Sequence, residues 1–187
     1  MRLVRIGDKG SERAGVLASD QDFYDLSSIG DFSEEFFSKN SRQDIQKQLG
    51  KLIERGLKPE KIGTQRWGAP IARPHQIICI GLNYADHAQE TGAEIPSEPI
   101  IFTKSPNTLI GPYDNVHIPV KSEKTDWEVE LAIVIGKQCR YLKSEEAALK
   151  SIFGYMISND ISEREFQLER EGQWSKGKSC ETFNLAG

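Results

Sequence analysis

The segment from Trp127 to Ile135 constrains the fold of this chain more than any other part of the sequence. It is rich in Val and Ile, which favour β-strands, and Gly136 follows it. Because successive side chains of a strand point to opposite faces, Glu128 and Glu130 share one face and the apolar residues around them share the other. The chain is therefore predicted to build a strand on which two carboxylates stand side by side, with Cα atoms about 6.5 Å apart.

The beginning of the sequence predicts a small group of strands followed by helices. Turn signals separate three β-rich runs, at residues 2–6, 14–18 and 23–27. Apolar residues recur at helical spacing within residues 33–54, with a break at which Ser41 can cap a second helix. We therefore expect a meander and two short helices.

A change in composition predicts a domain boundary. Residues 56–74 are rich in Gly, Pro, Lys and Arg and lack periodicity, which indicates a small N-terminal domain of residues 1–70 and a second domain of residues 71–187. Further elements are predicted in the second domain: a buried strand at 76–81, strands at 100–104 and 153–158, and helices at 83–91, 143–151 and 162–170. The fold class is predicted to be α+β, mainly β.

Composition and charge exclude several classes of partner. With 37% hydrophobic residues, the 187-residue chain has the composition of an ordinary globular protein. Its formal net charge of -4 gives no overall electrostatic attraction to nucleic acid or anionic lipid. The longest apolar run is far shorter than the roughly 20 residues that cross a bilayer, and the first ten residues do not form a signal peptide. Three widely spaced cysteines fit reduced thiols. A cytoplasmic protein is expected.

Asp160 can supply a third carboxylate, because it follows the predicted strand at 153–158. Three hard oxygen ligands favour Mg²⁺, Mn²⁺ or Ca²⁺ over Zn²⁺. Two other interpretations stay open at this point. Glu128 and Glu130 can form a solvated strand face, and Asp160 can cap a helix that begins at Ile161.

Two further patterns can carry chemistry. His87 and Glu90 are three residues apart in the predicted helix at 83–91, so a carboxylate can orient an imidazole that acts as a general base. Lys178 lies in a Gly-containing segment that can bring its ammonium to an anionic substrate. From spacing alone, an exposed polar helix face is the favoured interpretation of His87 and Glu90, and a solvated side chain is the favoured interpretation of Lys178.

Taken in order, four segments resemble the fumarylacetoacetate hydrolase family. They read IGLNYADH from Ile80, TDWEVELAIVIG from Thr125, NDISEREFQ from Asn159 and QWSKGKSCET from Gln173. The resemblance runs from about residue 75 to the end. The N-terminal region is similar to the extra domain of the branch that includes ureidoglycolate lyase-like and 2,4-diketo-3-deoxy-fuconate hydrolase-like enzymes.

The resemblance implies a mixed β-roll, often dimeric, in which Glu128, Glu130 and Asp160 hold a divalent cation, with Mg²⁺ expected first. The cation would stabilise the enolate that forms when the neighbouring C–C bond of a 2-oxo acid breaks. The other implied roles are water activation by His87 oriented by Glu90, stabilisation or protonation of the carbanion by Lys178, and substrate contact by Arg164 and Gln167.

The family leaves the reaction open. Hydrolysis of an acylpyruvate or 2,4-dioxo acid is our first expectation, before decarboxylation or isomerisation of a 2-oxo diacid and before ureidoglycolate lysis. Members of the family continue well past Gly187, so the second domain is expected to be truncated at its C-terminus. A catalytically silent fragment is therefore the alternative of another class.

Overall fold

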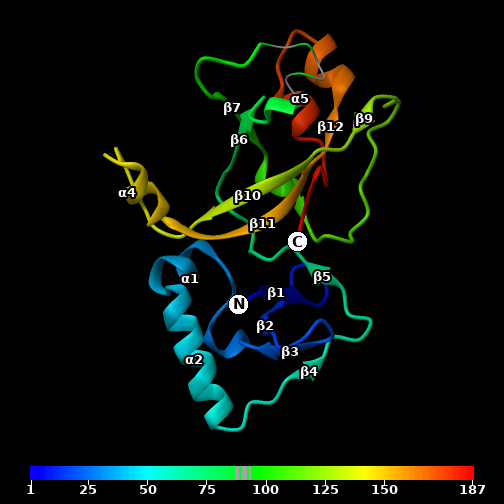
Figure 1. Cartoon of the computed structure of the whole chain (residues 1–187). Helices are drawn as coiled ribbons and strands as arrows, with labels where there is room; N and C mark the ends of the chain where they lie inside the picture. Colours follow the sequence, from blue (N-terminus) through cyan, green and yellow to red (C-terminus); the bar gives the residue numbers. More distant parts are fainter. Residues whose placement is uncertain (87–88, 90–91, 93) are drawn as a thin grey trace.

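An antiparallel sheet forms from the first part of the chain in the computed structural model, which describes residues 1–86, 89, 92 and 94–187 (Figure 1). Its five strands lie in the order β4-β3-β2-β1-β5. They are β1 (Leu3–Ile6), β2 (Arg13–Leu17), β3 (Asp22–Asp25), β4 (Glu60–Lys61) and β5 (Trp67–Gly68). The predicted meander is confirmed as β1 to β3, and the two short strands β4 and β5 lie in the region that lacks periodicity.

The two predicted helices are confirmed, and they pack beside this sheet. Helix α1 (Glu34–Lys39) begins after Ser33, and α2 (Arg42–Glu54) begins after Ser41, whose side chain forms a capping box with Asp44. Both helices contribute to an apolar core that they share with β2. The members of this core are Ala14, Val16, Leu26, Phe32, Phe36, Phe37 and Ile45.

The second part of the chain contains a four-stranded sheet and two strand pairs. The sheet has the order β10-β11-β13-β8, with β10 (Val129–Ile135) antiparallel to β11 (Ile152–Asp160). Its other strands are β13 (Asn184–Ala186) and β8 (Leu109–Ile110), and the pairs are β6 (Ile77–Gly81) with β7 (Ile100–Lys104) and β9 (Thr125–Asp126) with β12 (Ser162–Glu163). The short helices are η1 (Ser27–Ile29), η2 (Pro106–Thr108), α4 (Glu145–Leu149), η3 (Glu165–Glu169) and α5 (Ser175–Lys178).

Several expectations from the sequence need correction. Residues 162–170 do not form one charged helix, because β12 pairs with β9 before the five-residue π-helical turn η3. Asp160 caps no helix, since it is the last residue of β11 and β12 follows. Strand β6 is not fully buried, because Ile78 is 59% exposed. The helix expected at 83–91 includes residues that lie outside the described part of the chain.

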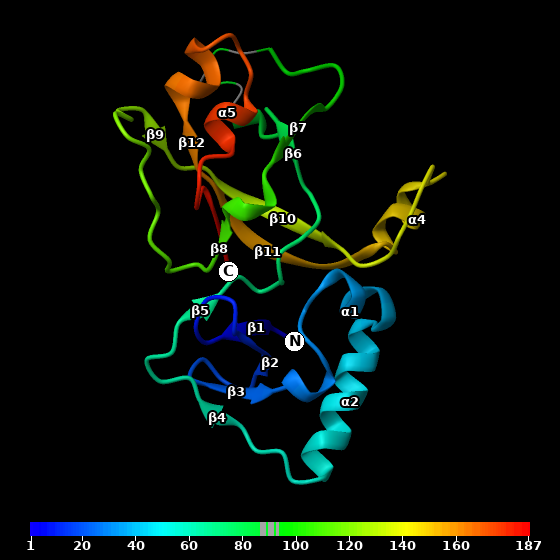
Figure 2. The same ribbon diagram turned by 180° about the vertical axis from the view of Figure 1, so that it is seen from behind.

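The N-terminal sheet lies below the β10-β11 pair in Figure 1 and in the reverse view of Figure 2, and close contacts join it to the second part of the chain. Arg66 Nη1 donates to Glu12 at 2.8 Å and Arg66 Nε donates to Asp114 at 2.6 Å. At Gly111 a Cβ atom would lie 2.0 Å from the carbonyl oxygen of Trp67, so only glycine permits this approach. The N-terminal sheet is thus held against the segment that follows β8. Among the described residues, none of the helices combines the length and apolar character of a membrane span.

Candidate metal centre

Alternation along β10 points the two glutamates inward. Val129 is 65% exposed and Leu131 is 61% exposed, whereas Glu128 and Glu130 between and beside them are partly buried. Glu128 immediately precedes β10, which begins later than the predicted strand at 127–135. The alternation of side chains expected from the sequence is nevertheless observed, and both carboxylates lie on the same side.

Asp160 joins them because β11 runs antiparallel to β10. Its backbone N–H donates to the carbonyl oxygen of Glu128 at 2.8 Å, which places the end of one strand beside the beginning of the other. Its side chain is only 2% exposed. Glu128, Glu130 and Asp160 each offer a carboxylate oxygen, and these oxygens lie within 4.8 Å of one another. Hard oxygen donors at this spacing fit a cation such as Mg²⁺, Mn²⁺ or Ca²⁺.

Two buried lysines contact this carboxylate cluster. Lys178 Nζ donates to Asp160 Oδ2 at 2.8 Å and to Glu128 Oε2 at 2.9 Å. Lys104 Nζ donates to Asp160 Oδ1 and also, at 3.0 Å, to the carbonyl oxygen of Ile161. Asp160 therefore has one ammonium group on each carboxylate oxygen. Such pairing is what a charge needs when it is withdrawn from water.

The predicted substrate-contacting residues lie on the opposite side of Glu128. Arg164 Nη2 contacts Glu128 Oε1 at 2.6 Å and Asp126 Oδ2 at 2.7 Å. Its Nη1 donates to the amide oxygen of Gln167 at 3.1 Å, and Gln167 is buried. Three cationic side chains, on Lys104, Lys178 and Arg164, thus surround the three carboxylates.

These neighbours move the pKa values of the two glutamates in opposite directions. For Glu128, burial favours the neutral carboxyl, but Lys178 and Arg164 outweigh it and lower the pKa. For Glu130, burial comes first, repulsion from Asp160 and Glu128 adds to it, and the pKa rises to about 7. A cation beside Glu130 would therefore lower this pKa and favour the ionised carboxylate.

A family model for the fumarylacetoacetate hydrolase C-terminal region matches residues 76–187, which is more than half of the chain. The chain belongs to the fumarylacetoacetate hydrolase family. The match includes the three carboxylates, Lys104 and Lys178. The resemblance that the four motifs indicated is therefore confirmed at the level of the family, and so is the α+β, mainly β fold.

Relatives from this hydrolase family match all or nearly all of the chain. A Burkholderia ambifaria protein that carries the name "Putative hydrolase" is 42% identical over 188 residues, which is 100% of this chain and 64% of that protein. The crystal structure of 2-hydroxyhepta-2,4-diene-1,7-dioate isomerase from Mycobacterium marinum has a TM-score of 0.73 and 27% identity, covering 100% of this chain and 64% of that one. Fumarylacetoacetate hydrolase from Exiguobacterium antarcticum has a TM-score of 0.69 and 30% identity, covering 98% and 64%. The chain thus spans a little under two thirds of each relative.

The site residues predicted from the sequence do not coincide fully with those that the structure describes. His87 and Glu90, the predicted general base and its partner, lie outside the described residues. Lys104 was missed. Its signal in the sequence is a single charged residue at the end of the apolar strand at 100–104, and only the tertiary structure brings it to Asp160, 56 positions away.

The raised pKa of Glu130 predicts how stability depends on pH when no divalent cation is added. The folded carboxyl titrates at about 7 and the reference value is 4.5, so the folded chain binds more protons between these values. The stabilisation is complete below about pH 4.5 and is lost as pH rises through about 7. We expect the melting temperature of the wild type, relative to Glu130→Gln, to fall over this range. A constant difference between the two proteins would contradict this prediction.

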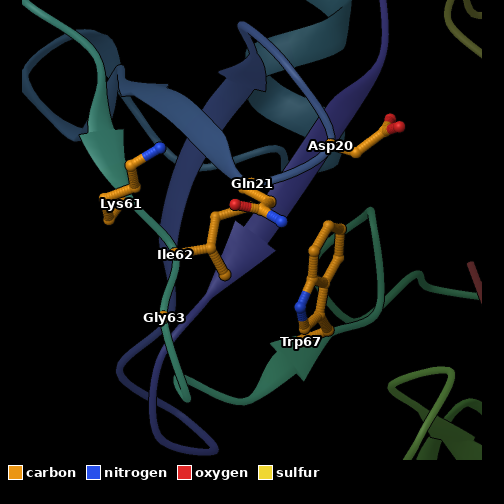
Figure 3. Close-up of a pocket in the computed structure, with 6 residues that line it drawn as sticks. All are labelled: Asp20, Gln21, Lys61, Ile62, Gly63 and Trp67. Carbon is orange, nitrogen blue, oxygen red and sulfur yellow. The ribbon is translucent and has the colours of Figure 1, made fainter.

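The N-terminal sheet carries a separate hollow of about 440 Å³ (Figure 3). Figure 3 shows Trp67 on one side and Lys61 with Ile62 on the other. Its charged groups already have partners, because Lys61 contacts Asp22 at 3.0 Å and Asp20 contacts Arg2 at 2.7 Å. We therefore assign the chemistry to the carboxylate cluster and not to this hollow.

Proposed function

We propose that this chain is the metal-binding part of a divalent-metal-dependent hydrolase that cleaves a C–C bond in an acylpyruvate or another 2,4-dioxo acid. The observation that carries the proposal is the set of three carboxylate oxygens within 4.8 Å of one another. Buried Lys178 contacts two of the three carboxylates, so the same site offers oxygen ligands to a cation and a donor to a substrate anion. Membership of the hydrolase family supports this assignment.

The position of each residue in the site suggests a different role in the reaction. Glu128, Glu130 and Asp160 would hold the cation, which supplies positive charge to the oxygen on which negative charge develops when the C–C bond breaks. Lys178, only 3% exposed, would stabilise or protonate the carbanion end of the leaving fragment. Arg164 is 23% exposed beside Glu128, so its guanidinium can orient a substrate carboxylate at the edge of the site.

Hydrolysis also needs a base that activates water. We assign this step to His87, oriented by Glu90, on the spacing of the two residues in the sequence. The imidazole would take a proton from water as the water attacks the carbonyl that is more distant from the cation. Proton transfer of this kind typically contributes about 10²–10⁴-fold to a rate.

Isomerisation of an unsaturated 2-oxo diacid is the second candidate. It is favoured by the Mycobacterium marinum relative, which is known as 2-hydroxyhepta-2,4-diene-1,7-dioate isomerase. An isomerase uses the same enolate stabilisation but no attacking water. We also assign residues 1–70 to the extra N-terminal domain that one branch of the family carries. This assignment is compatible with hydrolysis and with isomerisation.

The replacement His87→Asn separates the two reactions. The wild-type chain with Mg²⁺ is assayed against a series of acylpyruvates for release of pyruvate, and against a 2-hydroxy dienedioate for the shift of its double bond. We expect hydrolysis by the wild type and a loss of at least about 100-fold in the variant. Double-bond migration without pyruvate release would favour the isomerase. Equal hydrolysis by both proteins would remove His87 from the mechanism.

A further inference from the structure

Lys104 differs from the other cations of the site in how completely the protein encloses it. Its side chain has 0% exposure, whereas that of Arg164 is 23% exposed. Its ammonium donates to Asp160 Oδ1 and to the carbonyl oxygen of Ile161, the next residue along the chain. One cation therefore holds both the side chain of Asp160 and the peptide group that follows it.

The opposite oxygen of Asp160 lies on the side of Glu128. Lys178 Nζ joins Asp160 Oδ2 to Glu128 Oε2, at 2.8 and 2.9 Å, so Oδ2 is the oxygen on the side of Glu128. Backbone contacts fix the rest of the residue. The N–H of Asp160 donates to Glu128 at 2.8 Å, and its carbonyl oxygen accepts from Ser162 Oγ at 3.0 Å.

Strand β7 is itself fastened to helix α5 on both sides of Lys104. Ser175 Oγ donates to the carbonyl oxygen of Thr103 at 3.1 Å, and the N–H of Ser105 donates to Ser179 Oγ at 3.0 Å. These two bonds join the neighbours of Lys104 to the ends of the helix that carries Lys178. The same contacts help to place the two ammonium groups on the two oxygens of one carboxylate.

We propose that Lys104 is a positioning residue that orients Asp160 for cation binding. By holding Oδ1, it leaves Oδ2 on the side of Glu128, within a set of carboxylates whose oxygens have the spacing that a cation needs. The inference rests on the proposed metal-dependent function. It gives a role to a buried lysine that would otherwise only repel a cation bound beside it.

The direction in which Mn²⁺ affinity changes when Lys104 is replaced distinguishes a positioning role from simple charge repulsion. Lys104→Met removes the charge and both hydrogen bonds while keeping an unbranched side chain. If Lys104 acted only through its charge, Mn²⁺ would bind the variant more tightly than the wild type. If Lys104 orients Asp160, Mn²⁺ binding weakens by about 10–100-fold, the usual effect of losing a residue that supports a ligand.

The experiment titrates Mn²⁺ into the full chain by calorimetry, well below the melting temperature, for wild type, Lys104→Met and Lys124→Met. Lys124 is the control because it is a 50% exposed lysine paired with exposed Glu169. Weaker binding in Lys104→Met alone supports the proposal, and unchanged or tighter binding overturns it. A wild type that binds no Mn²⁺ overturns the proposed metal function as well.

A second variant covers the case in which Lys104→Met does not unfold cooperatively. Lys104→Gln keeps one donor for Asp160 or Ile161, and we expect its Mn²⁺ affinity to lie between those of wild type and Lys104→Met.

Proton exchange of the Lys104 ammonium tests the same proposal without a mutation. In ¹⁵N-lysine-labelled wild type, the protons of this ammonium are expected to exchange slowly with water both with and without Mg²⁺. Fast exchange after Mg²⁺ addition would show that Lys104 leaves Asp160, and would overturn the proposal.

Discussion

Millimolar Mg²⁺ or Mn²⁺ is expected to raise the melting temperature of the wild-type chain, and replacing Glu130 by glutamine is expected to abolish this rise. Among the described residues, no hydrogen bond or ion pair holds the Glu130 side chain, so the replacement removes a proposed ligand without breaking a contact there. A cation at 100 times its dissociation constant stabilises the native state by about 2.7 kcal/mol. For a chain of this size that corresponds to about 5–10 °C. Activity is expected to fall by about 1,000-fold with the cation lost.

Thermal unfolding with and without the cation measures this directly, with Glu123→Gln as the matched control. Glu123 is exposed and close in sequence, so its variant should keep the full shift. Without the cation, Glu130→Gln should melt no lower than the wild type at pH 8, because burial disfavours the carboxylate that it removes, and Asp160 and Glu128 repel that carboxylate. A full cation shift in Glu130→Gln would exclude Glu130 as a ligand.

Lys178→Met is expected to reduce turnover by about 100–1,000-fold, the usual loss when one donor to a developing negative charge is removed. Cation binding should be kept or become tighter, because the ammonium contacts the same two carboxylates, Glu128 and Asp160, that the cation would use. The variant therefore separates catalysis from ligand binding. Glu130→Gln, in contrast, should lose both.

Steady-state rates and Mn²⁺ titration on the same preparations test this separation. Lys176→Met is the control, since Lys176 lies on the same short helix but is exposed. Loss of turnover in the Lys178 variant with Mn²⁺ affinity kept would support the assigned role. If turnover and Mn²⁺ affinity fell together, Lys178 would instead be a structural partner of the carboxylates.

The sequence predicted those parts of the fold that are determined by neighbouring residues, such as side-chain alternation in a strand and the capping of a helix. Side-chain alternation placed Glu128 and Glu130 on one face, and Ser41 marked the beginning of α2 correctly. The cluster itself was only one interpretation among several until the motifs were taken together, because Asp160 comes from another strand. Spacing alone could not choose between a ligand and a helix cap.

Tertiary contacts decided the features that the sequence analysis missed. The charged residues after Ser162 have helical character, but Ser162 and Glu163 pair with β9 instead. Glu163 is fully buried and accepts from Thr125 Oγ1 at 3.1 Å, a contact that no local pattern encodes. Lys104 was missed for the same reason, since its partners are distant in the sequence.

The alternation along β10 limits how this gene can change in length. Inserting or deleting one codon between Glu128 and Ile135 would turn every later side chain of the strand to the opposite face. If the change falls between Glu128 and Glu130, Glu130 would point outward and Leu131 would point toward the remaining carboxylates. Length variants among descendants of this sequence should therefore differ by even numbers of codons in this strand, or compensate a single change with a bulge nearby. Single-residue changes in length should accumulate in the connecting segments instead.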